Sequence, residues 1–255
     1  MTIIRIEGYG PWTLTLGSDR EGQLQMLQAK VYYDLQRIFS DHDCIVFSNR
    51  FDEYFAITNG LSVEEHEAIL HQLAKLHNNL KLSMAIGSGE TAHEANLSAF
   101  IARKEGKAHE KSEDNGVLLF ESGRSRGREK NDDAVQIMHI DIDSSTKLSS
   151  RLSPYEITLL VAKLYARLSE AFLARNSLTF FLGGDNFMVV SNGVTVDEAG
   201  SIINSEAAHE IKLNCGIGIG RTGRKAAAAA TQALDKIRDL RSEGNIQSIY
   251  EVRCP

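Results

Sequence analysis

Two short acidic motifs in the second half of the chain could hold a divalent metal ion. HIDID at 139–143 ends a predicted strand, and GGDN at 183–186 lies in a predicted hairpin turn. In a β-α-β-β-α-β sheet the first strand lies beside this hairpin, so Asp141 and Asp185 are expected at one sheet edge. Two such carboxylates repel each other unless a cation lies between them, and Mg²⁺ prefers one or two carboxylates with phosphate oxygens. Each motif alone is also typical of an ordinary turn, but together they favour a metal site.

Residues around these motifs could bind the phosphates of a nucleotide. The hairpin glycines allow a phosphate to approach the backbone where a side chain would collide. An arginine follows a glycine-rich strand, and further basic residues lie on the last predicted helix. A solvent-exposed surface is an equally good interpretation of these basic residues, and the sequence leaves both open. The candidate phosphate-binding residues are Gly183, Gly184, Asn186, Arg221, Lys236 and Arg238.

The two motifs belong to the second of two copies of one unit. Residues 50–60 match residues 183–193 at an offset of 133, and residues 82–95 match residues 213–226 at an offset of 131. A weaker match of residues 3–9 with residues 138–144 takes Glu7 as the counterpart of Asp141. Because the three segments recur in the same order at nearly one offset, the sequence predicts an internal duplication.

Each copy has the same expected order of strands and helices, read from apolar periodicity. In the first copy the strands are expected at 3–6, 44–48, 54–58 and 80–86, with helices at 20–39, 63–76 and 91–103. The second copy repeats this order and ends with a helix near Leu240. The predicted fold is α+β: tandem ferredoxin-like domains, βαββαβ with an extra helix and an antiparallel sheet in each. The expected boundaries are a first repeat at 1–108, a charged connection with one short strand at 109–133, and a second repeat with the metal site at 134–255.

The composition excludes several classes of protein. The 255 residues carry a net charge of −6, which argues against a broad nucleic-acid-binding surface. There is no apolar run of the length that a membrane helix needs and no signal-peptide pattern at the start of the sequence. The three cysteines are widely spaced, so we expect neither a disulfide framework nor a cysteine-bound zinc ion. We therefore expect a cytoplasmic protein that binds neither nucleic acid nor membrane.

Several motifs together resemble the archaeal-type GTP cyclohydrolase III family. In the first half these are YGPWT at 9–13, RFD at 50–52 and ITNG at 57–60. In the second half they are HIDID at 139–143, GGDNFM at 183–188, SNG at 191–193 and GIGIGRT at 216–222. The resemblance spans nearly the whole chain, and the joint occurrence of these motifs is highly specific.

This resemblance implies a pair of palm domains related to nucleotidyl cyclases and GGDEF domains, assembled as a homotetramer. It implies an enzyme that opens the imidazole ring of GTP and releases pyrophosphate, giving 2-amino-5-formylamino-6-(5-phospho-ribosylamino)pyrimidin-4(3H)-one. Two Mg²⁺ ions are expected at Asp141, Asp185 and the carbonyl group of Ile142, with K⁺ or another monovalent cation assisting. Asp141 and Asp185 are the predicted catalytic residues. The first repeat could contribute Glu7, Tyr9, Trp12, Arg50 and Asp52.

The first repeat departs from the family pattern, which has Asp-Asn before YGPW and Phe-Asp-Asn in the first hairpin. Here these positions read Glu7-Gly8 and Phe51-Asp52-Glu53. We therefore expect the second repeat to hold the metal ions. Two alternatives stay open from the sequence. A nucleotidyl or dinucleotide cyclase would use the same palm site with a 3′-hydroxyl as nucleophile, and a non-catalytic sensor would bind GTP without turnover.

Overall fold

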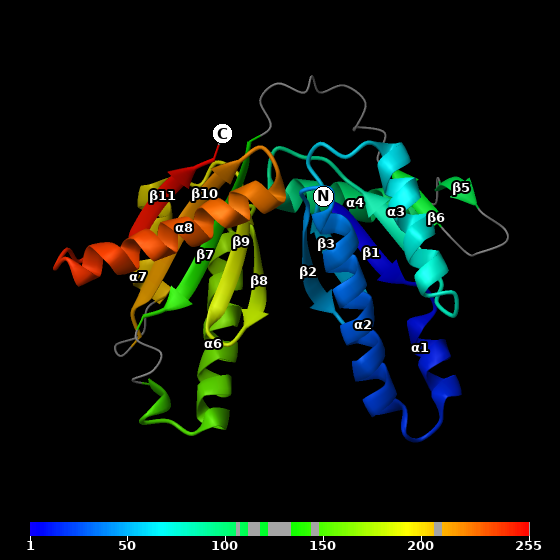
Figure 1. Ribbon diagram of the computed structural model, residues 1–255, viewed down its shortest axis with the longest axis horizontal. Coiled ribbons are helices and arrows are strands. Elements are labelled where there is room, and N and C mark those ends of the chain that lie inside the picture. Colours follow the sequence, from blue (N-terminus) through cyan, green and yellow to red (C-terminus); the bar gives the residue numbers. More distant parts are fainter. Residues whose placement is uncertain (106–107, 112–117, 122–133, 144–147, 207–210, 255) are drawn as a thin grey trace. The chain divides into compact units, whose positions relative to one another are not determined.

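A computed structural model of the chain describes residues 1–105, 108–111, 118–121, 134–143, 148–206 and 211–254. The chain divides into two compact units (Figure 1). The first unit comprises Met1–Gly89 and Glu94–Asp132, and the second comprises Glu90–His93 and Asp133–Pro255. Each unit has one sheet covered by helices on both faces, and each is described by itself.

The first unit contains a ferredoxin-like sheet extended at one edge. Its strands run in the order β2-β3-β1-β4-β6-β5, and the first four are antiparallel neighbours. Beyond them, β6 runs parallel to β4. The strands are β1 (Thr2–Ile6), β2 (Ile45–Arg50), β3 (Glu53–Ile57), β4 (Leu82–Ile86), β5 (Ala108–Lys111) and β6 (Leu118–Glu121). The helices are α1 (Tyr9–Thr13), the 3-10 turn η1 (Leu14–Leu16), α2 (Arg20–Ser40), α3 (Val63–Leu76) and α4 (Ala92–Glu105).

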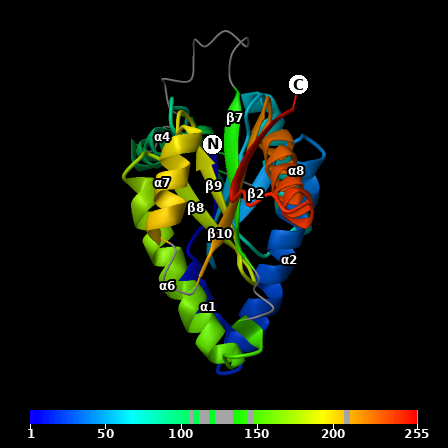
Figure 2. The same ribbon diagram turned by 90° about the vertical axis from the view of Figure 1, so that its left-hand side faces the viewer.

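The second unit repeats this order of strands and helices. Its strands run in the order β11-β10-β7-β9-β8, and β11 is parallel to β10. The strands are β7 (Val135–Ile142), β8 (Leu178–Gly183), β9 (Asn186–Ser191), β10 (Leu213–Gly220) and β11 (Ile249–Arg253). The helices are α6 (Pro154–Leu173), α7 (Val196–Glu206) and α8 (Gly223–Ser242). Figure 2 shows α8 on one face of this sheet and α6 with α7 on the other.

The predicted duplication and fold class are confirmed, with one addition. In both units a strand that comes after the extra helix pairs parallel to the fourth strand, so the repeat extends past the ferredoxin-like order. This strand is β11 after α8 in the second unit; in the first unit it is β6, which follows α4 and β5. The segment 109–133, predicted as a charged connection, contributes β6 to the first sheet. The remainder of that segment, apart from the end of β5, lies outside the described residues.

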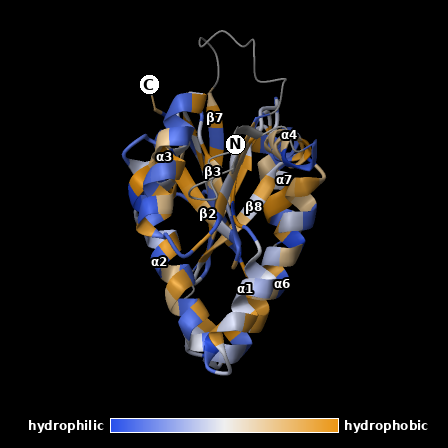
Figure 3. Ribbon diagram, turned by 90° about the vertical axis from the view of Figure 1, so that its right-hand side faces the viewer, coloured by the Kyte–Doolittle hydropathy of each residue, from blue (hydrophilic) through white to orange (hydrophobic). Residues whose placement is uncertain are grey.

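Helix starts in both units follow from local sequence signals. Ser62 before α3 and Ser153 before α6 each form a capping box with a glutamate three residues later. These boxes satisfy backbone N–H groups that the first helical turn leaves unpaired. The helices α2 and α3 mix hydrophobic and hydrophilic residues along their length, as expected for helices with one buried face (Figure 3).

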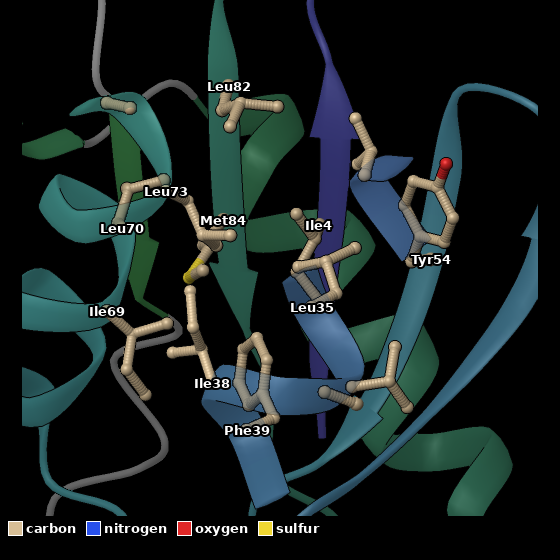
Figure 4. Packing of buried hydrophobic residues seen from close by; sticks show 14 of the residues in the cluster. Ile4, Leu35, Ile38, Phe39, Tyr54, Ile69, Leu70, Leu73, Leu82 and Met84 are labelled. Carbon is tan, nitrogen blue, oxygen red and sulfur yellow. The ribbon is translucent and has the colours of Figure 1, made fainter. Parts of the chain in front are cut away.

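The two hydrophobic cores lie on equivalent sheet faces. In the first unit the sheet packs against α2 and α3 through the residues shown in Figure 4, among them Ile4, Phe39 and Tyr54. In the second unit Ile140 and Phe187 of the sheet lie in one cluster with residues of α6 and α7. No helix among the described residues combines the length and the apolar character that crossing a membrane requires.

Glycines set how closely the last helix of the second unit lies on its sheet. A Cβ atom at Gly216 or Gly218 of β10 would overlap the carbonyl oxygen of Ala230 or Ala226 on α8. In the first unit a Cβ atom at Gly87 would collide in the same way with the backbone of α4. Gly216 and Gly218 therefore fix the distance of α8 from β10, and the contacts between side chains of α8 and of β7 depend on that distance.

Candidate functional site

Asp141 lies near the end of β7 and is only 6% exposed. Asn186 of β9 is its partner on one side, and Asn214 of β10 is its partner on the other. Asn214 Nδ2 donates a hydrogen bond of 2.9 Å to Asp141 Oδ1. Arg238 Nη2, reaching from α8, donates to Oδ2 at 2.8 Å. This hydrogen bond raises the pKa of Arg238, so a charged guanidinium compensates a carboxylate that has little contact with solvent.

Asp185 lies in the two-residue turn that joins β8 to β9 (Figure 1). Gly183 and Gly184 before it have φ angles of 108° and 62°, in the region that favours glycine. A Cβ atom at Gly183 would meet nothing within 4 Å, so the backbone conformation and not crowding requires this glycine. Asn186 Nδ2 donates to Asp185 Oδ1 at 2.9 Å. Asn186 is also the strand partner of Asp141, so this one residue links the turn to the position of the first carboxylate.

His139 connects the turn to helix α8. It lies two residues before Asp141 on β7, so the two side chains share a face of the sheet. Its Nε2–H donates to Asn186 Oδ1 at 3.0 Å, and its Nδ1 lies 3.2 Å from Thr231 Oγ1. Burial lowers the pKa of His139, which favours the neutral ring at neutral pH. His139 thereby holds the amide group of Asn186 in the orientation that donates to Asp185.

Arg241 supports Asp141 from one turn further along α8. Its Nη2 donates to Asn214 Oδ1 at 2.8 Å, and its Nη1 pairs with Asp143. Arg238 and Arg241 are three residues apart, so both lie on the helix face that meets β7. Sequence reasoning missed Asn214 and Arg241. The antiparallel pairing of β10 with β7 and the spacing of the two arginines were signals that could have identified them.

The structure brings together most of the predicted second-repeat residues but separates two of them from Asp141. Arg221 follows β10, which runs antiparallel to β7 and whose last residue Gly220 pairs with Val135. It therefore lies at the opposite end of the sheet, on the order of 20 Å away along the strand. Lys236 lies two residues from Arg238 on α8 and so projects from a different face. The side chain of Ile142 is buried in the core, and its carbonyl group stays a predicted ligand.

The strand registers show that the predicted counterpart of Asp141 was wrong. Arg5, and not Glu7, occupies the equivalent position on β1. Opposite Arg5 lie Glu53 and Ser83, the counterparts of the two asparagines that flank Asp141. Arg5 and Glu7 are two residues apart and share a sheet face, so the alternating apolar pattern of the strand is compatible with either assignment.

The first unit thus has an ion pair where the second has two carboxylates. Asp52 is the counterpart of Asp185, and Arg5 Nε lies 3.6 Å from its Oδ2. Arg50 Nη2 donates to Glu53 at 3.1 Å. Glu7 accepts hydrogen bonds from Ser83 at 2.6 Å and from Arg103 at 2.8 Å.

The two predicted aromatic residues of the first repeat lie together on α1. The ring centroids of Tyr9 and Trp12 are 6.1 Å apart, and Gln28 Nε2 donates to the Tyr9 hydroxyl at 2.6 Å. Both rings pack against the first hydrophobic core. This packing accounts for their positions without a bound ligand.

Comparison with known proteins gives matches over almost the whole chain. The family model described as GTP cyclohydrolase III matches residues 1–251. GTP cyclohydrolase III of Methanobrevibacter smithii is 39% identical over 244 residues, covering 94% of this chain and 93% of that protein. GTP cyclohydrolase III of Methanocaldococcus jannaschii is 37% identical over 254 residues, covering 98% and 92%. Among solved structures, a GGDEF domain from Pseudomonas aeruginosa is 18% identical with a TM-score of 0.41, covering 48% of this chain and 84% of that one.

Proposed function

The chain belongs to the GTP cyclohydrolase III family, and on this premise we propose that it opens the imidazole ring of GTP at a site around Asp141 and Asp185. The product would be the formylamino-pyrimidine 5′-monophosphate, with loss of the β- and γ-phosphates. The match to relatives of this name over nearly their full length supports the activity. The observation that supports this location is that Asp141 on β7 pairs with Asn186, the residue that directly follows Asp185 in the turn before β9.

We propose that Asp141, Asp185 and the Ile142 carbonyl group hold Mg²⁺. The donor set suits a hard cation because it consists of oxygen atoms. Each oxygen of Asp141 accepts one hydrogen bond and keeps a lone pair, and Asp185 Oδ2 has no partner within the described part of the chain. No group of three or more His, Cys, Asp or Glu side chains among the described residues could hold a metal ion. Nucleotide phosphates would therefore complete the coordination, as is usual for Mg²⁺. A bound divalent ion would neutralise phosphate charge and lower the pKa of a water molecule bound to it.

The protein groups have distinct roles in this proposal. Asn214 and Arg241 fix the carboxylate of Asp141, while His139 and Asn186 fix that of Asp185. The Arg238 side chain is 57% exposed and can contact a phosphate oxygen while its neighbours hold Asp141 in place. The open space above Gly183 leaves room for a phosphate beside the turn. A second ion, a monovalent cation such as K⁺, and assembly into a homo-oligomer complete the proposal, by family resemblance.

Incubation of the purified chain with GTP, Mg²⁺ and K⁺ tests this function. Ultraviolet spectra would follow loss of the purine, and mass spectrometry with ³¹P NMR would identify the products. A formylamino-pyrimidine monophosphate supports the proposal. An intact purine carrying a cyclic phosphate would instead indicate a nucleotidyl cyclase, and bound but unchanged GTP would indicate a sensor. Assays without K⁺ test the role of the monovalent cation. The molecular mass of the protein in solution tests the proposed homo-oligomer.

A further inference from the structure

A cavity of about 650 Å³ lies in the first unit, in a region that the proposed reaction does not use. It is bounded by α4 and by the sheet face opposite the core of Figure 4, where Ile3 and Arg5 of β1 project. This face corresponds to the face that carries Asp141 in the second unit, because Arg5 and Asp141 occupy equivalent register positions. The cavity is within the size range of small-ligand sites.

Four cationic side chains line this cavity: Arg5, Arg50, Arg103 and Lys104. Three carboxylates compensate part of their charge. Arg103 is hydrogen-bonded to Glu7, and Arg50 is hydrogen-bonded to Glu53. The cations therefore exceed the carboxylates by one, once the Asp52 beside Arg5 is counted.

Two of the four cations have unused hydrogen-bonding capacity. The side chain of Arg5 is 34% exposed, and its Nε lies 3.6 Å from Asp52 Oδ2, a distance beyond ordinary N–H···O hydrogen bonds. Lys104 has no ion-pair or hydrogen-bond partner in the part of the chain that the structure describes. Guanidinium and ammonium groups with free donors beside a cavity are suited to phosphate oxygens, which arginine can bind in a bidentate manner.

We propose that this cavity binds the polyphosphate group of a nucleotide directly, without a divalent metal ion. In the second unit the two carboxylates need a cation to approach a polyphosphate. In the first unit Arg5 itself supplies that positive charge at the equivalent position. Phe100 also lines the cavity and is 57% exposed, so an aromatic ring is available for contact with a base. The chain would thus carry a nucleotide site separate from Asp141 and Asp185.

Calorimetric titration in EDTA tests this site with two probes, inorganic pyrophosphate and GTP. The full chain carrying both Asp141→Asn and Asp185→Asn is used, so that the proposed metal site does not contribute. We expect one bound ligand per chain under these conditions. Equal affinity for the two probes would show that the cavity recognises only the phosphates. Tighter binding of GTP would show that the cavity also contacts the nucleoside. Absence of binding by both probes at millimolar concentration would overturn the proposal.

Two substitutions locate the binding. Arg5→Gln should weaken it at least about tenfold, since a charged bidentate donor is lost. Lys104→Gln should weaken it about threefold to tenfold and leaves no described carboxylate unpaired, so its effect does not depend on folding. Arg20→Gln, on the exposed start of α2, is the matched control and should bind as before. Unchanged affinity in both cavity variants would place the ligand elsewhere and reject this site. Because turnover is not measured, this result is independent of the proposed reaction.

Discussion

The two units carry opposite charges at one position of one fold. Asp141 and Arg5 have the same strand neighbours, lie on the same sheet face and are covered by equivalent helices. The cores behind them are built from equivalent strands and helices. The same backbone therefore carries the proposed metal site in one unit and an ion pair in the other, and the two edges differ in their side chains. This difference can be tested by parallel changes in the two units.

The largest expected contrast is between the two hairpin aspartates. Asp185→Asn should lower turnover of GTP by about 10³-fold, because a neutral amide is a poor ligand for Mg²⁺. Asp185 is half-buried in a turn outside the hydrophobic core, so the variant should fold normally, as circular dichroism would show. Asp52→Asn is the matched change in the first unit and should cost at most a few-fold. Equal losses in the two variants would show that the first repeat shares the catalytic site.

The next contrast concerns Asn214 and Ser83, the equivalent strand partners of Asp141 and Arg5. Asn214→Ala removes a donor to Asp141 and an acceptor for Arg241, so turnover should fall about 10- to 100-fold, as for other residues that orient metal ligands. The equivalent change Ser83→Ala affects only the hydrogen bond to Glu7 and should leave turnover within about twofold. Steady-state kinetics at several Mg²⁺ concentrations separates a loss of metal affinity from other causes of a lower turnover. If the loss is in metal affinity, the rate of Asn214→Ala should recover at high Mg²⁺. A variant that loses only thermal stability would contradict the role of Asn214 in orienting Asp141.

Much of this arrangement could be predicted from the sequence because it depends on local patterns. The order of strands and helices follows from apolar periodicity and capping residues, and the duplication follows from the motifs. Adjacency of Asp141 and Asp185 then follows from the ferredoxin-like strand order alone.

The errors arose where local patterns are degenerate or where a distance along the sheet matters. Alternation fixes which face a strand residue occupies but not its register, so Glu7 was compatible with the position that Arg5 holds. Arg221 was predicted near the phosphates, although the direction of β10 carries it to the far end of the sheet. The contacts of Arg238 and Arg241 depend on how closely α8 approaches the sheet. That distance is set by overlaps at Gly216 and Gly218 that only coordinates reveal.

The buried His66 should make the stability of the first unit depend on pH. His66 is buried in the first unit, where its Nδ1–H donates to the Ser62 carbonyl at 2.7 Å and Thr2 lies 2.8 Å from its Nε2. Burial lowers the pKa of His66 to about 4, below its ordinary value of 6.5. The unfolded chain therefore takes up the proton first as the pH falls, and stability present above pH 6.5 is lost towards pH 4. We expect a loss of about 2 kcal/mol between pH 7 and pH 5 from this group.

Urea unfolding followed by the fluorescence of Trp12 measures this effect in the first unit, since the chain has one tryptophan. His66→Gln should lower stability at pH 7 but reduce its decrease between pH 7 and pH 5. His139→Gln in the second unit is the comparison, and it should lower turnover while leaving the Trp12 transition unchanged. A pH dependence of that transition that is equally steep in wild type and His66→Gln would show that other groups take up the proton.

The smallest expected effect comes from converting the first edge into the second. Arg5→Asp places a carboxylate at the position equivalent to Asp141, near Asp52, the counterpart of Asp185. The ion pair that is lost is long and partly exposed, so the direct cost should be below about 1 kcal/mol. In the Asp141→Asn, Asp185→Asn background the variant should bind Mn²⁺ weakly, with a Kd on the order of millimolar, because Glu53 and Asp52 lie at the same edge.

Electron paramagnetic resonance of free Mn²⁺ measures this affinity, and the melting temperature should rise with Mn²⁺ in Arg5→Asp but not in Arg5→Gln. Pyrophosphate binding in EDTA should weaken at least about tenfold in both variants, since both remove the guanidinium. Gain of the cation together with loss of the anion would show that one side chain decides which ion this edge accepts. Absence of Mn²⁺ binding would mean that the glycine turn at 183–184 is also needed, since Arg50 and Phe51 occupy the equivalent positions in the first unit.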